Sequence, residues 1–89
     1  MIESPLEDFA CAEAEKAGWF VRKLQWTGRR NAPDRFFAKD GRVVLIEFKR
    51  PGGTATDNQL EEHKELRRKG MLVWVIDYFD KDFADWIFE

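Results

Sequence analysis

The chain has 89 residues and a mass of 10.5 kDa, with 44% hydrophobic and 36% charged residues. This length fits one domain, and the apolar content is too high for a disordered tail. Its single cysteine excludes an internal disulfide, and no apolar run reaches the roughly 20 residues of a membrane helix. The acidic N-terminus also lacks the basic start of a signal peptide. We therefore expect a single soluble, cytoplasmic domain, made more stable by a metal ion or a second subunit.

The net charge of −2 conceals a basic centre between two acidic flanks. Residues 22–50 contain nine basic and three acidic side chains, which gives this segment a charge of +6. Such a segment is compatible with an anionic partner such as nucleic acid. The alternative is that these side chains are solvated or paired with the acidic flanks, and the pI of 5.5 argues against a protein that coats DNA generally.

The first predicted element is a helix that ends at Gly18. Ser4 is a candidate N-cap, Pro5 suits the first helical position, and Glu7 stands where a capping box places its acid. Aromatic and β-branched runs then predict strands over residues 19–26, 35–39 and 42–49. Between the last two, Asp40-Gly41 predicts a hairpin turn.

A second helix is predicted from Thr56 to Gly70, with Gln59 three positions after the cap as in a capping box. A fourth, continuously apolar strand over 71–76 and a short amphipathic helix over 80–88 complete the chain. Because a helix connects them, the third and fourth strands should be parallel. The expected fold is α/β: an αβββαβ core with a mixed β-sheet flanked by helices, and a short C-terminal helix.

One group of residues points to chemistry. Pro33-Asp34 begins the second strand, and Glu47-Phe48-Lys49 lies near the end of the third. Side chains alternate along a strand, so Glu47 and Lys49 should share one face. A divalent cation between Asp34 and Glu47 would explain two acids in an otherwise apolar sheet. Lys49 would then position or deprotonate an attacking water and offset charge on a phosphate.

The alternative is structural. Glu47 and Lys49 would form an ion pair at the end of a strand, and Asp34 would be a turn residue after Pro33. The E-x-K triplet is common by itself, but the proline–aspartate pair, the hairpin and the strand context agree with a site.

These residues resemble the PD-(D/E)xK nuclease signature, and a longer pattern is similar to the VRR-NUC domain of virus-type replication-repair nucleases. The similarity extends from Glu3 to Asp77. It comprises Glu3-Ser4-Pro5-Leu6-Glu7, Gly18, Lys23, Gly28, Pro33-Asp34-Arg35, Gly41-Arg42-Val43, Glu47 to Gly53, Gln59, Gly70 and Val73 to Asp77.

The resemblance implies a restriction-endonuclease-like fold and Mg²⁺- or Mn²⁺-dependent hydrolysis of DNA. It also implies a homodimer that acts on branched DNA such as four-way (Holliday) junctions. By the same resemblance, Asp34 and Glu47 are the main metal ligands, the Phe48 carbonyl is a third and Lys49 is catalytic. Glu7 matches an acid that the first helix brings to the site, and Gln59 matches a glutamine close to the active centre. Nothing in the sequence tests recruitment by a helicase.

Asn31 departs from the family pattern because it stands where the loop usually has a second glycine. Asparagine tolerates a positive φ better than most residues, so we expect the turn to survive. Arg29 and Arg30 on this loop are the main candidates for phosphate contacts. The further basic candidates for binding nucleic acid are Lys23, Arg35 and Arg50.

Other polar and aromatic residues have less specific explanations. Glu7 is either a metal ligand or the capping acid for Ser4, and Gln59 faces the same choice with Thr56. His63 is expected to be a packed residue of the second helix rather than a general base. Cys11 has no partner motif and is expected to be inert. The C-terminal aromatic side chains are assigned to the core or a dimer contact rather than to base stacking.

The sequence therefore predicts a small metal-dependent DNA endonuclease. The alternative function is a non-catalytic DNA-binding or accessory module that keeps the fold, and a plain α/β interaction domain is a third.

Overall fold

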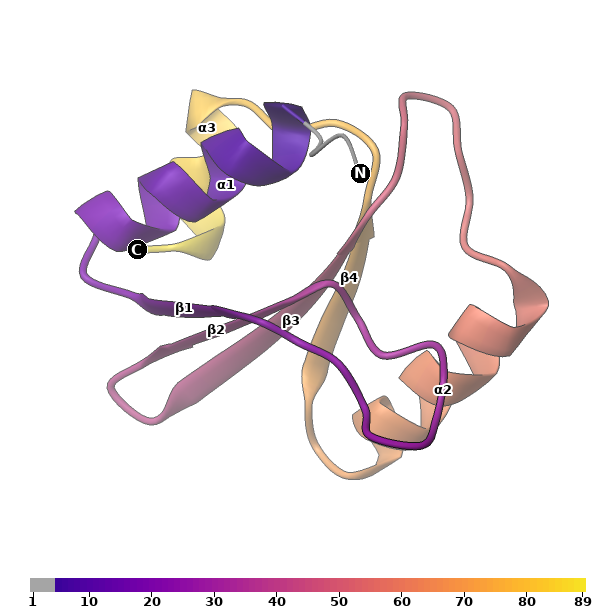
Figure 1. Ribbon diagram of the computed structural model, residues 1–89. Coiled ribbons are helices and arrows are strands. Elements are labelled where there is room, and N and C mark those ends of the chain that lie inside the picture. The colour runs from indigo at the N-terminus through magenta and orange to yellow at the C-terminus, as the bar shows by residue number, and fades with distance from the viewer. Residues whose placement is uncertain (1–4) are drawn as a thin grey trace.

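The computed structural model describes residues 5–89 and contains one four-stranded mixed sheet with helices on both faces (Figure 1). The strand order is β1-β2-β3-β4, and Figure 1 shows α1 and α3 on one face and α2 on the other. The predicted αβββαβ core with a short C-terminal helix is confirmed. In chain order the elements are α1 (Pro5–Lys16), β1 (Phe20–Lys23), β2 (Arg35–Lys39), β3 (Arg42–Phe48), α2 (Asp57–Arg68), β4 (Leu72–Ile76) and α3 (Lys81–Ile87).

The pairing of the strands follows from the connections between them. β1 and β2 pair antiparallel, as do β2 and β3, which are joined by the tight turn at Asp40 and Gly41. Both turn residues have positive φ, 50° and 80°, as the predicted hairpin requires. α2 connects β3 to β4, and these two strands are parallel. β3 is therefore central, and the five residues Val44–Phe48 are all buried.

The main core lies between the sheet and the pair α1 and α3. Ala10 and Ala14 of α1 have no exposed surface and allow close approach to Phe37 and Ile46 of the sheet. Each fully buried Phe or Ile side chain contributes about 1.5–3 kcal/mol relative to exposure. Phe88 closes this core, because its carbonyl accepts a 2.9 Å hydrogen bond from the Trp19 indole.

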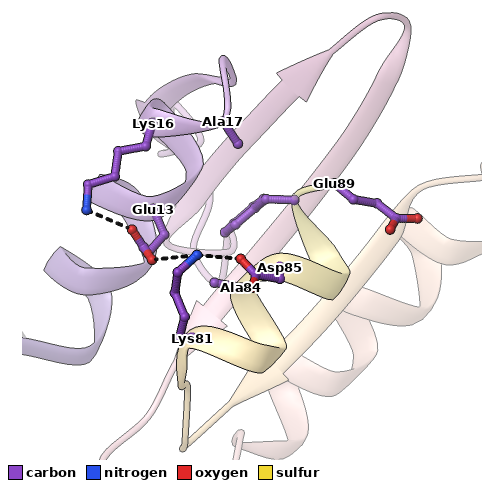
Figure 2. A pocket seen from close by; sticks show the side chains of 8 residues that line it. Glu13, Lys16, Ala17, Lys81, Ala84, Asp85 and Glu89 are labelled. Carbon is purple, nitrogen blue, oxygen red and sulfur yellow. Dashed lines mark hydrogen bonds and ion pairs between the residues drawn. The ribbon is translucent and has the colours of Figure 1, made fainter.

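A buried carboxylate joins α1 to α3. Glu13 of α1 lies 3.1 Å from Lys16 and 3.5 Å from Lys81, which also pairs with Asp85 at 2.5 Å. Figure 2 shows these side chains around a pocket of about 320 Å³ between the two helices. The hydrogen bond from Lys16 is the main cause that lowers the pKa of Glu13. The pocket is thus a structural junction in which Glu13 and Asp85 are paired with lysines.

The second helix is capped as the sequence predicts. The Thr56 hydroxyl accepts a 3.1 Å hydrogen bond from the Gln59 amide, and the Gln59 side chain accepts one of 3.0 Å from the Thr56 amide. Leu45 of β3 and Val73 of β4 pair with each other and are buried, and His63 of α2 is completely buried. This helix covers only one end of its face, and the part of the sheet toward the β2–β3 hairpin stays uncovered (Figure 1).

Several boundaries differ slightly from those expected. β1 ends at Lys23 rather than at residue 26, because Arg35 of β2 is its last pairing partner. The predicted helix over 80–88 is Lys81–Ile87, with Asp80 as its N-cap. The proposed cap at Ser4 and the match at Glu3 lie outside the described residues. Within residues 5–89, no helix is long and apolar enough to cross a membrane.

Candidate active site

The two predicted acids lie side by side at one end of the sheet. The register pairs Arg35 with Ile46, so Asp34, one residue earlier, stands level with Glu47. The Phe48 amide donates a 2.8 Å hydrogen bond to the Asp34 carboxylate. This bond fixes Asp34 against the end of β3. Strand pairing therefore brings together two acids that are 13 positions apart in the sequence.

Glu47 is the most constrained group at this site. It is 4% exposed, and its Oε1 atom has no hydrogen-bond partner in the described part of the chain. Its Oε2 atom accepts a 3.4 Å hydrogen bond from the side-chain Nε2 of Gln59 and lies 3.5 Å from the Lys49 ammonium. Burial, followed by the charge of Asp34, raises the pKa of Glu47 to about 7, although Lys49 acts in the opposite direction. The carboxyl group is thus held where its ionisation is unfavourable.

Lys49 and Gln59 form the other half of the site. Lys49 follows β3, and its amide donates a 2.8 Å hydrogen bond to the Ile76 carbonyl of β4. Its ammonium group donates a 2.8 Å hydrogen bond to the Gln59 side-chain oxygen. That same oxygen accepts the capping bond from Thr56. Gln59 therefore caps α2 and contacts both Lys49 and Glu47, so the two alternatives drawn from the sequence are compatible.

The donor set suits a hard divalent cation. No group of three or more His, Cys, Asp or Glu side chains with metal-binding geometry occurs within residues 5–89. Two carboxylates with a backbone carbonyl are nevertheless an ordinary set for Mg²⁺, which retains several waters when it binds a phosphate substrate. Two observations fit such an ion: Oε1 of Glu47 lacks a hydrogen-bond partner within residues 5–89, and Asp34 lies beside Glu47.

Glu7 has a different neighbour in the structure. Its carboxylate lies 2.6 Å from the Nε atom of Arg35, and both side chains are largely buried between α1 and the sheet. This pair links the first helix to the strand that begins beside Asp34. Metal ligation by Glu7 stays a prediction, as does contact of Arg35 with nucleic acid.

The basic candidates surround the loop between β1 and β2. Arg29 and Arg30 are exposed on it, and Arg29 lies 3.3 Å from Glu62 of α2. The loop is closed by a 3.0 Å hydrogen bond from the Leu24 amide to the Asp34 carbonyl. Asn31 has a φ of 72°, so asparagine adopts the left-handed conformation of the usual glycine, as expected. Lys23 and Arg50 are also exposed.

One residue that holds the site was missed as a functional candidate. Asp77, just after β4, accepts a 3.0 Å hydrogen bond from the Gly52 amide and so fixes the loop that follows Lys49. Asp77, Tyr78, Lys49 and Pro51 line a cavity of about 260 Å³ together with the start of α1. In the sequence, Asp77 was noted only as the last residue of the VRR-NUC-like pattern, and no role was assigned to it.

The two remaining titratable candidates are buried, as expected. Burial is the largest cause that lowers the pKa of His63, so its imidazole is neutral and packed. Burial raises the pKa of Cys11 to about 11, which makes it a poor nucleophile.

An acid–acid–lysine set at the end of a central strand, with helices on both faces of a mixed sheet, defines a nuclease of the PD-(D/E)xK class. A solved structure described as "VRR_NUC domain" superposes with a TM-score of 0.79 and 32% identity, over 92% of this chain and 88% of that one. A protein of Acyrthosiphon pisum secondary endosymbiont phage 1, named "Putative nuclease p44", is 37% identical over 79 residues. That alignment covers 88% of this chain and 85% of the phage protein.

No protein-family model matches the chain. The identity to these two proteins over most of their lengths nevertheless shows the family, and the chain belongs to the VRR-NUC family.

Proposed function

We propose that the protein is a deoxyribonuclease that hydrolyses phosphodiester bonds and requires Mg²⁺ or Mn²⁺. One observation carries the proposal: a buried carboxyl group, Glu47, lies beside a second one, Asp34, and has an oxygen without a partner among the described residues. Such an arrangement is unfavourable for two carboxylates alone, and a cation makes it favourable. The name of the phage relative supports the same class.

Each residue of the site has a defined task in this proposal. Asp34, Glu47 and the Phe48 carbonyl would hold the cation, with Glu7 as a further ligand. When bound, a divalent cation supplies Lewis-acid polarisation of a phosphoryl oxygen and helps to activate water. Lys49 places a positive charge beside the phosphate, where negative charge accumulates during attack. Gln59 holds the Lys49 ammonium group through the 2.8 Å hydrogen bond.

The proposed substrate is branched DNA such as a four-way junction, cut by a homodimer. The basic segment 22–50 and the exposed Arg29, Arg30 and Arg50 support an anionic substrate. Apolar exposure at β4 and α3 supports self-association, since Leu72 is 57% and Trp86 59% exposed. Two copies related by a twofold axis would present two sites to two strands.

A cleavage assay tests this function. Linear duplex and four-way junction DNA are incubated with the protein in EDTA, Mg²⁺ or Mn²⁺. We expect cleavage with metal only, and loss of at least about a hundredfold in rate for Asp34→Asn and for Lys49→Ala. Glu61→Gln, which alters an exposed side chain of α2 outside the site, controls for general damage.

The same assay addresses the alternative of a non-catalytic DNA-binding module. Binding of DNA without metal, and no cleavage with either metal, would support that module and refute the nuclease. Cleavage that survives in Asp34→Asn and Lys49→Ala would also refute the proposed site.

A further inference from the structure

A second surface on the sheet combines an exposed aromatic ring and a partly buried one with an arginine. Phe20 of β1 is 48% exposed, and its ring meets the edge of Phe36 of β2 at a centroid distance of 6.4 Å and an angle of 88°. The Arg22 guanidinium lies over the Phe20 ring, 3.9 Å from its centroid. These three residues form what we call the stacking patch. The strand register puts them on the face of the sheet that carries α2, and Figure 1 shows α2 near β4 and away from β1.

The stacking patch faces the same way as the active site. Arg22 pairs with Phe36, and Phe36 pairs with Leu45, which lies two residues before Glu47 on the same face of β3. Strand spacing and rise place the patch about 8–16 Å from Glu47. The loop with the exposed Arg29 and Arg30 connects the end of β1 to Asp34, so its basic side chains adjoin the end of the sheet that carries the carboxylates.

We infer that the stacking patch binds an unpaired segment of the DNA strand that enters the active site. Bases of single strands stack on aromatic rings and on arginine planes, whereas a duplex hides the faces of its bases. Arg22 offers a planar guanidinium over Phe20, and Phe20 and Phe36 supply the rings beneath and beside it. The basic charge of segment 22–50 complements the phosphates of the same strand.

The inference rests on the proposed nuclease function in one respect: that function identifies the bound strand as the one that enters the active site. Binding of an unpaired strand to the stacking patch does not itself require cleavage. The patch would make the protein prefer DNA with an unpaired segment next to the cleavage site, because two or three bases would then contact it. Its chemistry is stacking, which tolerates any base sequence.

Fluorescence anisotropy tests the inference directly. Fluorescein-labelled oligothymidine and an abasic oligonucleotide of equal length are titrated with protein in EDTA, so that no cleavage occurs. We expect wild type to bind oligothymidine about tenfold more tightly than the abasic strand. Phe20→Ala and Arg22→Ala should each weaken binding of oligothymidine about tenfold and remove most of this preference. Phe9→Ala, which removes an exposed aromatic ring from α1 on the opposite face of the sheet, should bind within about twofold of wild type.

Three results would overturn the inference. If wild type binds oligothymidine and the abasic strand equally, charge alone accounts for the binding. If Phe20→Ala binds oligothymidine as tightly as wild type does, the Phe20 ring does not take part in binding. A lower molar mass of Phe20→Ala in light scattering, together with weaker binding, would assign the patch to a second copy of this chain. Circular dichroism of each variant verifies that it folds.

Cleavage of DNA with Mn²⁺ on the same preparations separates this inference from the proposed function. Wild type that prefers oligothymidine but does not cleave would refute only the nuclease. Wild type that cleaves while Phe20→Ala binds normally would refute only the stacking patch.

Discussion

Replacing Glu47 with glutamine removes a carboxyl group whose ionisation is opposed by its surroundings. In the folded protein, burial and the charge of Asp34 raise the pKa of Glu47 from 4.5 to about 7. Between these pH values the folded state binds more protons than the unfolded state, so stability falls as pH rises. At about 1.4 kcal/mol per pH unit, the loss reaches roughly 3 kcal/mol above pH 7.

Glu47→Gln cannot ionise and therefore avoids this loss. In EDTA at pH 8, we expect the free energy of unfolding of the variant to exceed that of wild type by roughly 3 kcal/mol. At pH 4.5, the two free energies of unfolding should be about equal. Lys49 keeps its hydrogen bond to Gln59 in the variant. Urea denaturation followed by tryptophan fluorescence measures both proteins across this range.

The control is Glu61→Gln, which alters an exposed glutamate paired with Lys64 at 3.1 Å. Surface pairs of this kind are worth less than about 1 kcal/mol, so its effect should be small at every pH. A Glu47→Gln variant that is less stable than wild type at pH 8, or whose advantage does not change with pH, would refute the reasoning. The expected gain would show that the fold retains Glu47 at a cost in stability.

Three further outcomes follow from the contacts. Gln59→Ala and Thr56→Ala should each lose about 1 kcal/mol of stability, because each removes part of the capping box. Of these two side chains, that of Gln59 accepts the hydrogen bond from Lys49, so Gln59→Ala should also slow metal-dependent cleavage roughly tenfold relative to Thr56→Ala. Equal cleavage rates of the two variants would contradict this role of Gln59. Asn31 has a φ of 72°, a conformation that glycine adopts freely and a β-branched residue does not. Asn31→Gly should therefore keep its stability, whereas Asn31→Val should lose about 1–2 kcal/mol of unfolding free energy in urea denaturation. Equal stability of the two variants would argue against this turn. His63→Leu should gain about 1 kcal/mol at pH 7, since both ring nitrogens lack partners within residues 5–89. The difference in stability between His63→Leu and wild type should grow as pH falls toward 5. The pKa of His63 is lowered in the folded state, so the unfolded wild type binds protons more readily and wild type loses stability at low pH. A difference that shrinks as pH falls would contradict this prediction.

Much of the fold was predictable because its signals are local. The hairpin at Asp40-Gly41 and the capping box of Thr56 and Gln59 depend on residues within four positions, and both are confirmed. The positive φ of Asn31 is likewise set by its own turn. The end of β1 was missed because it depends on where a partner strand begins, which no local pattern records.

The candidate site shows the same division. Asp34 lies opposite Glu47 because the Asp40-Gly41 turn fixes the register of the hairpin between β2 and β3, so this juxtaposition could be predicted from the sequence. The pairing of Glu7 with Arg35 joins a helix to a strand 28 positions away, and the Gly52–Asp77 bond spans 25 positions. Such contacts arise from how the layers pack, and spacing in the sequence does not encode them.

Binding of Mn²⁺ tests the central claim most directly. Electron paramagnetic resonance measures how much Mn²⁺ remains in solution as protein is added without DNA. We predict that wild type removes Mn²⁺ from solution with an affinity that rises through pH 7 as Glu47 loses its proton. The double variant Asp34→Asn with Glu47→Gln should bind at least about tenfold more weakly. Equal binding by the two proteins would contradict the claim that these carboxylates share a divalent cation.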